Sequence, residues 1–171
     1  IAWRKLELEE NQEEKKMKIG IIIHSHTGNT LSVGEKLREV WGNEGHEVTL
    51  ERVRAENEEP SEALKTELAE APEIGPYDVV VFGAPVRGFS LSPVMKKYLN
   101  QMGSLKGKEV YCFVTQQLKS PIFGGNHSLG QMKQLCLSKG ERVSKSGIVN
   151  WSNKKRDEMI DKIVENFTGQ E

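Results

Sequence analysis

Three short runs of apolar residues constrain the fold of this chain more than any other feature of its sequence. They span residues 18–25 (KIGIIIHS), 78–85 (DVVVFGAP) and 109–116 (EVYCFVTQ). Runs without polar alternation are typical of strands that are buried on both faces, as in the middle of a parallel sheet. Residues 46–53 alternate in polarity and residues 142–149 form a weaker run, so we expect these two strands near the edges.

Amphipathic helical patterns fill the gaps between these runs. Ser92 and Pro93 are suited to be the N-cap and first residue of one helix, and Gly140 is placed to end another. Residues 63–70 also fit a helix. The other apolar stripes are Val33, Leu37, Val40 and Trp41; Val94, Met95, Tyr98, Leu99 and Met102; Leu129, Met132, Leu135 and Cys136; and Met159, Ile160, Ile163, Val164 and Phe167.

Five strand–helix units with short connections predict an α/β fold, in which helices cover both faces of a parallel sheet. Ligands of such open sheets bind beyond the carboxyl ends of the strands, where the strand order reverses. We therefore look for function in the loops that follow residues 23, 83 and 115.

The chain has 171 residues, which is the length of one domain, and residues 1–16 stand apart because they are rich in Glu and Lys. We interpret residues 1–16 as an N-terminal extension or a vector-derived tail, and residues 17–171 as the domain. The net charge of −1 argues against a basic nucleic-acid-binding surface. No stretch approaches the roughly 18 apolar residues that a membrane span needs.

We expect a cytoplasmic location, because no apolar secretory leader is visible and the cysteine content is low. Cys112 falls in an apolar run and Cys136 in an apolar stripe, so both are predicted to be core residues rather than redox groups. His24 has no carboxylate or cysteine partner at a suitable spacing, which argues against a catalytic or metal-binding role. His127 is a weak candidate for proton donation to a substrate.

The loop after the first apolar run carries hydroxyl groups at Ser25, Thr27 and Thr30, and Gly28 permits a tight turn. It leads into a helix N-terminus, where free N–H groups attract an anion. The loop holds no Lys or Arg, which suits a phosphate monoester held by neutral donors. The chain contains neither G-x-x-x-x-G-K-[ST] nor G-x-G-x-x-G. The alternative is that Thr27 or Asn29 only caps the helix.

Residues 25–30 (SHTGNT) resemble the [ST]-x-T-G-x-T phosphate loop of the flavodoxin family, and the resemblance extends from residue 17 to about residue 167. The last strand has no room for the insertion of long-chain flavodoxins. The resemblance implies a three-layer flavodoxin-like fold, a five-stranded sheet in the order 2-1-3-4-5, and bound FMN. It further implies that three hydroxyls and the backbone N–H groups hold the phosphate, in the segment Ser25, His26, Thr27, Gly28, Asn29 and Thr30.

The second loop implied by the resemblance contains Pro85, Val86, Arg87, Gly88 and Phe89. Phe89 is either the aromatic residue that lies against the flavin or a core residue at the helix entry. Gly88 either allows a peptide rearrangement near the flavin N5 or is only a turn glycine. Arg87 departs from the acidic surroundings of ordinary flavodoxins: near the ring it would stabilise the reduced anion, whereas pointing to solvent it would not.

In the third loop, the resemblance places Thr115, Gln116 and Gln117 at the pyrimidine edge of the flavin. Phe123 is suited to cover the ring, and Gly124 allows a close approach. The loop is long and contains a proline, which suggests a lid or a docking surface. It lacks the acidic, tyrosine-bearing pattern of well-studied electron carriers.

These features lead to three hypotheses. The first is an FMN-binding electron-transfer protein, and the second is an NAD(P)H-dependent FMN or quinone reductase of the same fold. The third is an interaction module without flavin. The corresponding partners are redox proteins, or NAD(P)H and a quinone; neither nucleic acid nor a membrane span is expected, and the oligomeric state is open.

Overall fold

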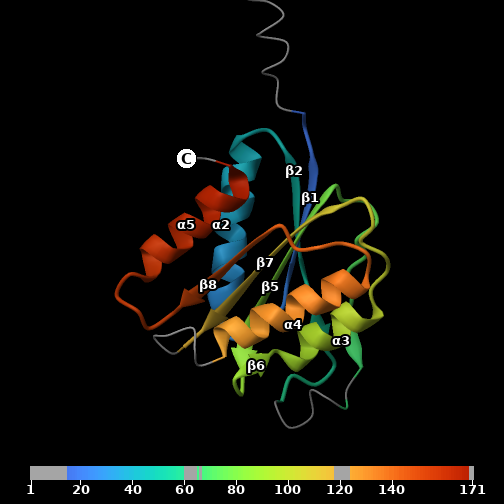
Figure 1. Cartoon of the computed structure of the whole chain (residues 1–171), viewed down its shortest axis with the longest axis vertical. Helices are drawn as coiled ribbons and strands as arrows, with labels where there is room; N and C mark the ends of the chain where they lie inside the picture. Colours follow the sequence, from blue (N-terminus) through green and yellow to red (C-terminus); the bar gives the residue numbers. More distant parts are fainter. Residues whose placement is uncertain (1–14, 60–64, 66, 118–123, 170–171) are drawn as a thin grey trace, which may run out of the picture.

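A five-stranded parallel sheet forms the centre of the molecule (Figure 1). The computed structural model describes residues 15–59, 65, 67–117 and 124–169. The strand order is β2-β1-β5-β7-β8, which in chain order is the predicted 2-1-3-4-5. The strands are β1 (Lys18–Ile23), β2 (Glu47–Arg52), β5 (Val79–Arg87), β7 (Glu109–Gln116) and β8 (Lys145–Asn150).

Helices cover both faces of this sheet, so the molecule has three layers (Figure 1). One face carries α2 (Asn29–Asn43) and α5 (Arg156–Thr168), which pack against each other. The other face carries α3 (Pro93–Gln101) and α4 (Gly125–Ser138). Within the described residues, no helix is both long and apolar enough to cross a membrane.

Strand β1 shows why the central runs had to be apolar on both sides. Ile19, Ile21 and Ile23 belong to the core under α2 and α5, whereas Ile22 belongs to the core under α3 and α4. All four side chains are fully buried. Each contributes roughly 1.5–3 kcal/mol to stability, so a polar residue at any of these positions would oppose the fold.

The helix boundaries follow the sequence signals closely. The Ser92 hydroxyl accepts the Met95 N–H at 3.3 Å, so Ser92 is the N-cap of α3 as predicted.

Strand β7 has the predicted limits, whereas β8 begins at Lys145, three residues later than expected. Strand β5 continues to Arg87, because its end pairs with a short strand, β6 (Ser90–Leu91).

The helix predicted over residues 63–70 is wrong at its end, where the chain forms strand β4 (Leu68–Glu70). This strand pairs in antiparallel fashion with β3 (Arg54–Ala55), and Arg54 Nε lies 3.5 Å from Glu70 Oε1. Leu68 packs against the core, so the pairing outweighs the weak helical pattern. Residues 63, 64 and 66 lie outside the described residues, as do residues 1–14 of the predicted extension.

Candidate functional site

A cavity of about 290 Å³ lies where the carboxyl ends of β1, β5 and β7 meet. It brings together the three loops that the sequence singled out, each following one of these strands. The volume is near the lower end of the roughly 300–1,000 Å³ typical of ligand pockets. The lining residues are His26, Thr27, Asn29, Thr30, Pro85, Val86, Arg87, Thr115, Gln116 and Gln117.

Ser25 stabilises the first loop through hydrogen bonds to the loop's own backbone. Its side chain is buried, and its Oγ accepts the backbone N–H of Gly28 at 3.2 Å and that of Leu31 at 3.3 Å. Gly28 has a φ of 93°, a conformation that L side chains rarely adopt, and it caps α2 without a side-chain hydrogen bond. The conformation of the loop is therefore fixed by the backbone of Gly28 and by the buried Ser25 hydroxyl.

Several backbone N–H groups of this loop are unpaired. Within the described residues, the N–H groups of His26, Thr27, Asn29 and Thr30 have no hydrogen-bond partner. Asn29 and Thr30 open α2, whose first turn contains no acidic residue. Free N–H groups at a helix N-terminus attract an anion through both hydrogen bonding and the helix dipole.

The hydroxyls of the loop are not equivalent. Thr27 is exposed, so its hydroxyl is accessible to a ligand. Thr30 is buried, and its Oγ1 lies 2.8 Å from Thr115 Oγ1, which links the first loop to the end of β7. Thr30 therefore positions the loop against the third loop as well as lining the cavity.

Arg52 supplies a cation that the sequence of the loop did not reveal. Its Nη2 donates to the Ser25 carbonyl at 3.0 Å, and its buried Nε has no partner among the described residues. The signal was available in the topology, because Arg52 ends β2 opposite Ile23, two residues before Ser25. A positive charge thus lies behind a loop that itself contains no Lys or Arg.

The second loop is a tight hairpin between β5 and β6. Gly88 and Phe89 form its turn with φ values of 55° and 64°, and two positive φ values are typical of a type I′ turn. Phe89 is 63% exposed, so the alternative that it is a core residue is wrong. Arg87 is half-buried and lines the cavity.

The hairpin is held from outside by two helices. Gln131 on α4 accepts hydrogen bonds through Oε1 from the Ser90 hydroxyl at 2.9 Å and from the Leu91 N–H at 2.8 Å. Lys96 on α3 donates to the Ser90 hydroxyl at 2.8 Å. These contacts fix the strand that returns from the Gly88–Phe89 turn.

The third loop closes the cavity with the end of β7. Thr115, Gln116 and Gln117 line it, and the buried Gln116 amide donates to the Asn150 side chain on β8. Gly124 packs behind the hairpin, since a Cβ there would lie 2.7 Å from the Phe89 Cα. Phe123, the predicted cover of the ring, lies outside the described residues.

His24 does have a carboxylate partner, contrary to the expectation from spacing. The residue is 2% exposed, and its ring has Nδ1 2.5 Å from Ser92 Oγ and Nε2 3.0 Å from Glu58 Oε2. Glu58 also accepts the Ala55 N–H at 2.8 Å. Sequence reasoning missed this pair because the two residues are 34 positions apart. His24 thus ties the start of the first loop to the N-cap of α3.

Burial lowers the pKa of His24 below its usual value of 6.5, despite the opposing attraction of Glu58, and the positive charge of Arg87 lowers that pKa further. The unfolded chain therefore takes up a proton near pH 6.5 while the folded protein does not. We expect the free energy of unfolding to fall as the pH decreases from about 7.5 to 5.5. Urea denaturation at both pH values measures this change.

The matched variant for this prediction is His24→Gln, which removes the titrating ring. It should be less stable than the wild type at pH 7.5, but its stability should change less between the two pH values. An equal change in both proteins would contradict the assignment to His24.

The remaining candidates lie elsewhere. Cys112 and Cys136 are fully buried in the core, as predicted. The described residues contain no cluster of His, Cys, Asp or Glu suited to hold a metal ion. His127 is exposed on α4 and lines a different surface groove.

The sequence and the fold both resemble known proteins. A profile of the flavodoxin domain matches residues 20–137. The curated NAD(P)H dehydrogenase (quinone) of Archaeoglobus fulgidus is 29% identical over 102 residues, which is 52% of each chain. The present chain therefore spans about half the length of this relative.

Solved structures agree with the fold. Oxidised flavodoxin 1 from Bacillus cereus superposes with a TM-score of 0.63 at 17% identity, over 90% of this chain and 99% of that one. A flavoprotein from Lactobacillus acidophilus NCFM, crystallised in complex with FMN, gives a TM-score of 0.57 at 17% identity, over 85% and 97% of the two chains.

Proposed function

The chain belongs to the flavodoxin domain family, and from this premise we propose that it binds FMN and transfers electrons. The observation that carries the proposal is the convergence of three separate loops on one cavity, with free backbone N–H groups at one end. The family resemblance alone would give the fold. The open donors at the start of α2 point to a phosphate-bearing ligand.

The residues present fit FMN. The N–H groups of residues 26, 27, 29 and 30, with the Thr27 hydroxyl, would hold the phosphate, and Arg52 would add a favourable charge. Residues 85–87 and 115–117 would border the ring. When bound, FMN supplies the redox chemistry, while the protein provides binding, orientation and electrostatic tuning.

Replacing Thr27 by Val should weaken FMN binding by about three- to tenfold, because one hydrogen bond to a partly solvated phosphate is worth roughly 1 kcal/mol. Fluorescence titration of the apoprotein with FMN measures the change. The control is Thr168→Val, which removes a hydroxyl that bonds to the Val164 carbonyl at the far end of α5. Equal affinities for wild type and Thr27→Val would contradict the role of this hydroxyl.

A second candidate is an NAD(P)H-dependent FMN or quinone reductase. Two observations favour it: the curated relative is named NAD(P)H dehydrogenase (quinone), and the Arg87 guanidinium borders the cavity, where it would stabilise a reduced anion. Anaerobic photoreduction of the FMN-loaded protein separates the two functions. Reduction in two spectral stages supports a one-electron carrier, whereas a single stage with rapid reduction by NADH or NADPH supports a reductase.

The third hypothesis, an interaction module without flavin, makes the opposite prediction about binding. Purified protein that neither contains nor takes up FMN would support it and would overturn both redox functions. The free donors of the first loop argue against this outcome.

A further inference from the structure

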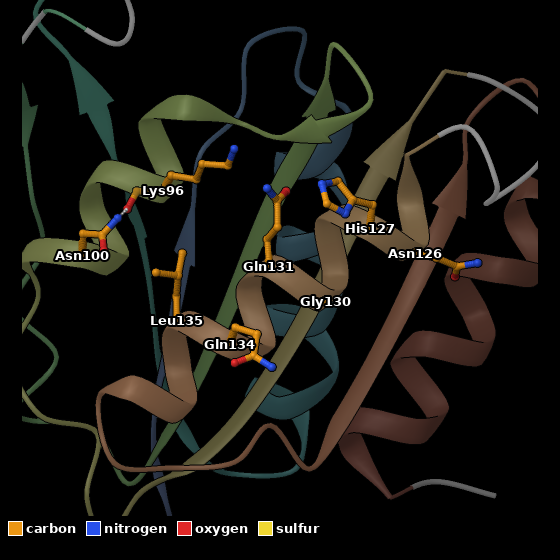
Figure 2. Close-up of a pocket in the computed structure, with 8 residues that line it drawn as sticks. All are labelled: Lys96, Asn100, Asn126, His127, Gly130, Gln131, Gln134 and Leu135. Atoms are coloured by element: carbon orange, nitrogen blue, oxygen red, sulfur yellow. Dashed lines mark hydrogen bonds between the residues drawn. The ribbon is translucent and has the colours of Figure 1, made fainter.

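A groove of about 650 Å³ runs between α3 and α4, on the face of the sheet opposite α2 and α5 (Figure 2). We call it the α3–α4 groove. It is open to solvent and is distinct from the cavity at the strand ends. Its lining contains amides, one lysine and one histidine but no carboxylate: Lys96, Asn100, Asn126, His127, Gly130, Gln131, Gln134 and Leu135.

Two ammonium groups bracket this groove without a carboxylate partner among the described residues. At one end, Lys96 Nζ donates to the Ser90 hydroxyl at 2.8 Å. At the other, Lys139 Nζ donates to the carbonyl of Asn100, a lining residue, at 2.8 Å. Each ammonium has three donors, so each retains donors for an incoming group. Both neighbours are neutral oxygens, which leave the positive charges uncompensated.

The segment of sequence that contains α3 and α4 is rich in lysine. Residues 93–140 contain seven lysines and a single carboxylate, Glu109, although the whole chain has a net charge of −1. Glu109 is hydrogen-bonded to the Tyr111 hydroxyl, and Tyr111 belongs to the core on the α2–α5 side. This segment is therefore basic in sequence, although Lys97 on α3 lies 3.5 Å from the carboxylate of Glu67.

The groove and the candidate cofactor cavity lie on either side of the same hairpin. Lys96 and Gln131 point toward each other from the two helices (Figure 2) and both hold Ser90, in the second strand of the hairpin. The first strand of that hairpin carries Val86 and Arg87, which line the cavity. A partner seated in the groove would therefore lie against the outside of the loop that borders the cofactor.

We infer that the α3–α4 groove is the docking surface for an acidic redox protein, an inference that rests on the proposed electron-transfer function. Charge complementarity selects the partner, because uncompensated lysines at both ends of an open groove attract a surface with spaced carboxylates. The arrangement is the reverse of an acidic carrier that docks on basic partners.

Calorimetric titration of the FMN-loaded protein at low ionic strength tests this inference. The probes are an oxidised plant-type ferredoxin, which is acidic, and cytochrome c, which is basic. We expect ferredoxin to bind more tightly, with an affinity that decreases as salt is added. The double variant Lys96→Gln/Lys139→Gln should bind ferredoxin about tenfold more weakly, because it removes both charges while keeping a donor at each position.

The control is Lys36→Gln/Lys162→Gln, which removes two positive charges from α2 and α5 on the opposite face; Lys36, unlike Lys96, is paired with a carboxylate, that of Asp161 at 2.6 Å. It should bind ferredoxin within about twofold of the wild type, since distant exposed charges are largely screened. Unchanged binding by the Lys96/Lys139 variant, or cytochrome c binding as tightly as ferredoxin, would overturn the docking surface.

The same titration with the apoprotein separates this inference from the proposed function. If the protein fails to bind FMN but binds ferredoxin in a Lys96- and Lys139-dependent manner, the docking surface stands and the redox function fails. If FMN binds and is photoreduced, but the affinity for ferredoxin is the same in the wild type and the Lys96/Lys139 variant, the redox function stands and the docking surface fails.

Discussion

The Ser25→Ala variant is expected to bind FMN about 30- to 100-fold more weakly than the wild type while keeping the fold. The Ser25 hydroxyl accepts two backbone N–H groups, of Gly28 and Leu31, and so fixes the loop that presents the free donors. Without it the loop must be ordered by the ligand itself, and the lost hydrogen bonds and ordering together amount to roughly 2–3 kcal/mol.

Fluorescence titration of the apoprotein with FMN measures this loss. Ser32→Ala is the matched control, because the Ser32 hydroxyl lies on the same helix but bonds only to the exposed Asn29 carbonyl. The control should retain wild-type affinity. If Ser25→Ala and Ser32→Ala bound FMN equally well, the loop would not be organised by Ser25, and the first loop would lose its assigned role.

The arrangement of the sheet could be predicted from sequence because it depends on local and redundant signals. In strand β1, every residue from Ile19 to Ile23 is buried, so the strand had to be apolar on both faces and had to lie inside the sheet. The start of α3 could likewise be predicted locally, because the N-cap Ser92 and the following Pro93 are adjacent in the sequence. Such signals do not require knowledge of distant parts of the chain.

The parts that could not be predicted depend on contacts between distant residues. Strands β3, β4 and β6 have two or three residues each, too few to show a periodic pattern. Glu58 meets His24 only because the chain after β2 passes beside the end of β1. Arg52 is an intermediate case: its position beside the first loop follows from the predicted strand order once the register of β2 on β1 is known.

The hairpin shows how a local sequence can mislead. Gly88 lies in the turn, which fits both alternatives considered from the sequence, but nothing in the residue type of Phe89 indicates a φ of 64°. This conformation is costly for an aromatic residue, so the surrounding contacts must stabilise it. Gln131 and Lys96 are hydrogen-bonded to the Ser90 hydroxyl on one side of the turn, and Gly124 contacts the Phe89 backbone on the other. Gly124 is therefore the position at which the hairpin is most sensitive to substitution.

Replacing Gly124 by Ala is expected to lower the free energy of unfolding by roughly 3–4 kcal/mol, because two costs add. The φ of 113° is unfavourable for any L residue, and the new Cβ would lie 2.7 Å from the Phe89 Cα and 2.8 Å from Val86 Cγ1. The Phe89 backbone cannot rotate away as a flexible side chain would. The hairpin must shift, so FMN affinity should fall as well.

Gly140→Ala is the control that separates these costs. Gly140 has a similar φ of 105°, but its nearest contact would be an ordinary 3.5 Å to Lys106. It should lose only roughly 1–2 kcal/mol, the cost of the backbone conformation alone, and should bind FMN normally. Urea denaturation and FMN titration of both variants measure the difference. Equal losses of stability in the two variants would mean that the contact between Gly124 and the hairpin adds no cost. A larger loss in Gly124→Ala, together with weaker FMN binding, would show that this close contact positions the second loop at the cavity.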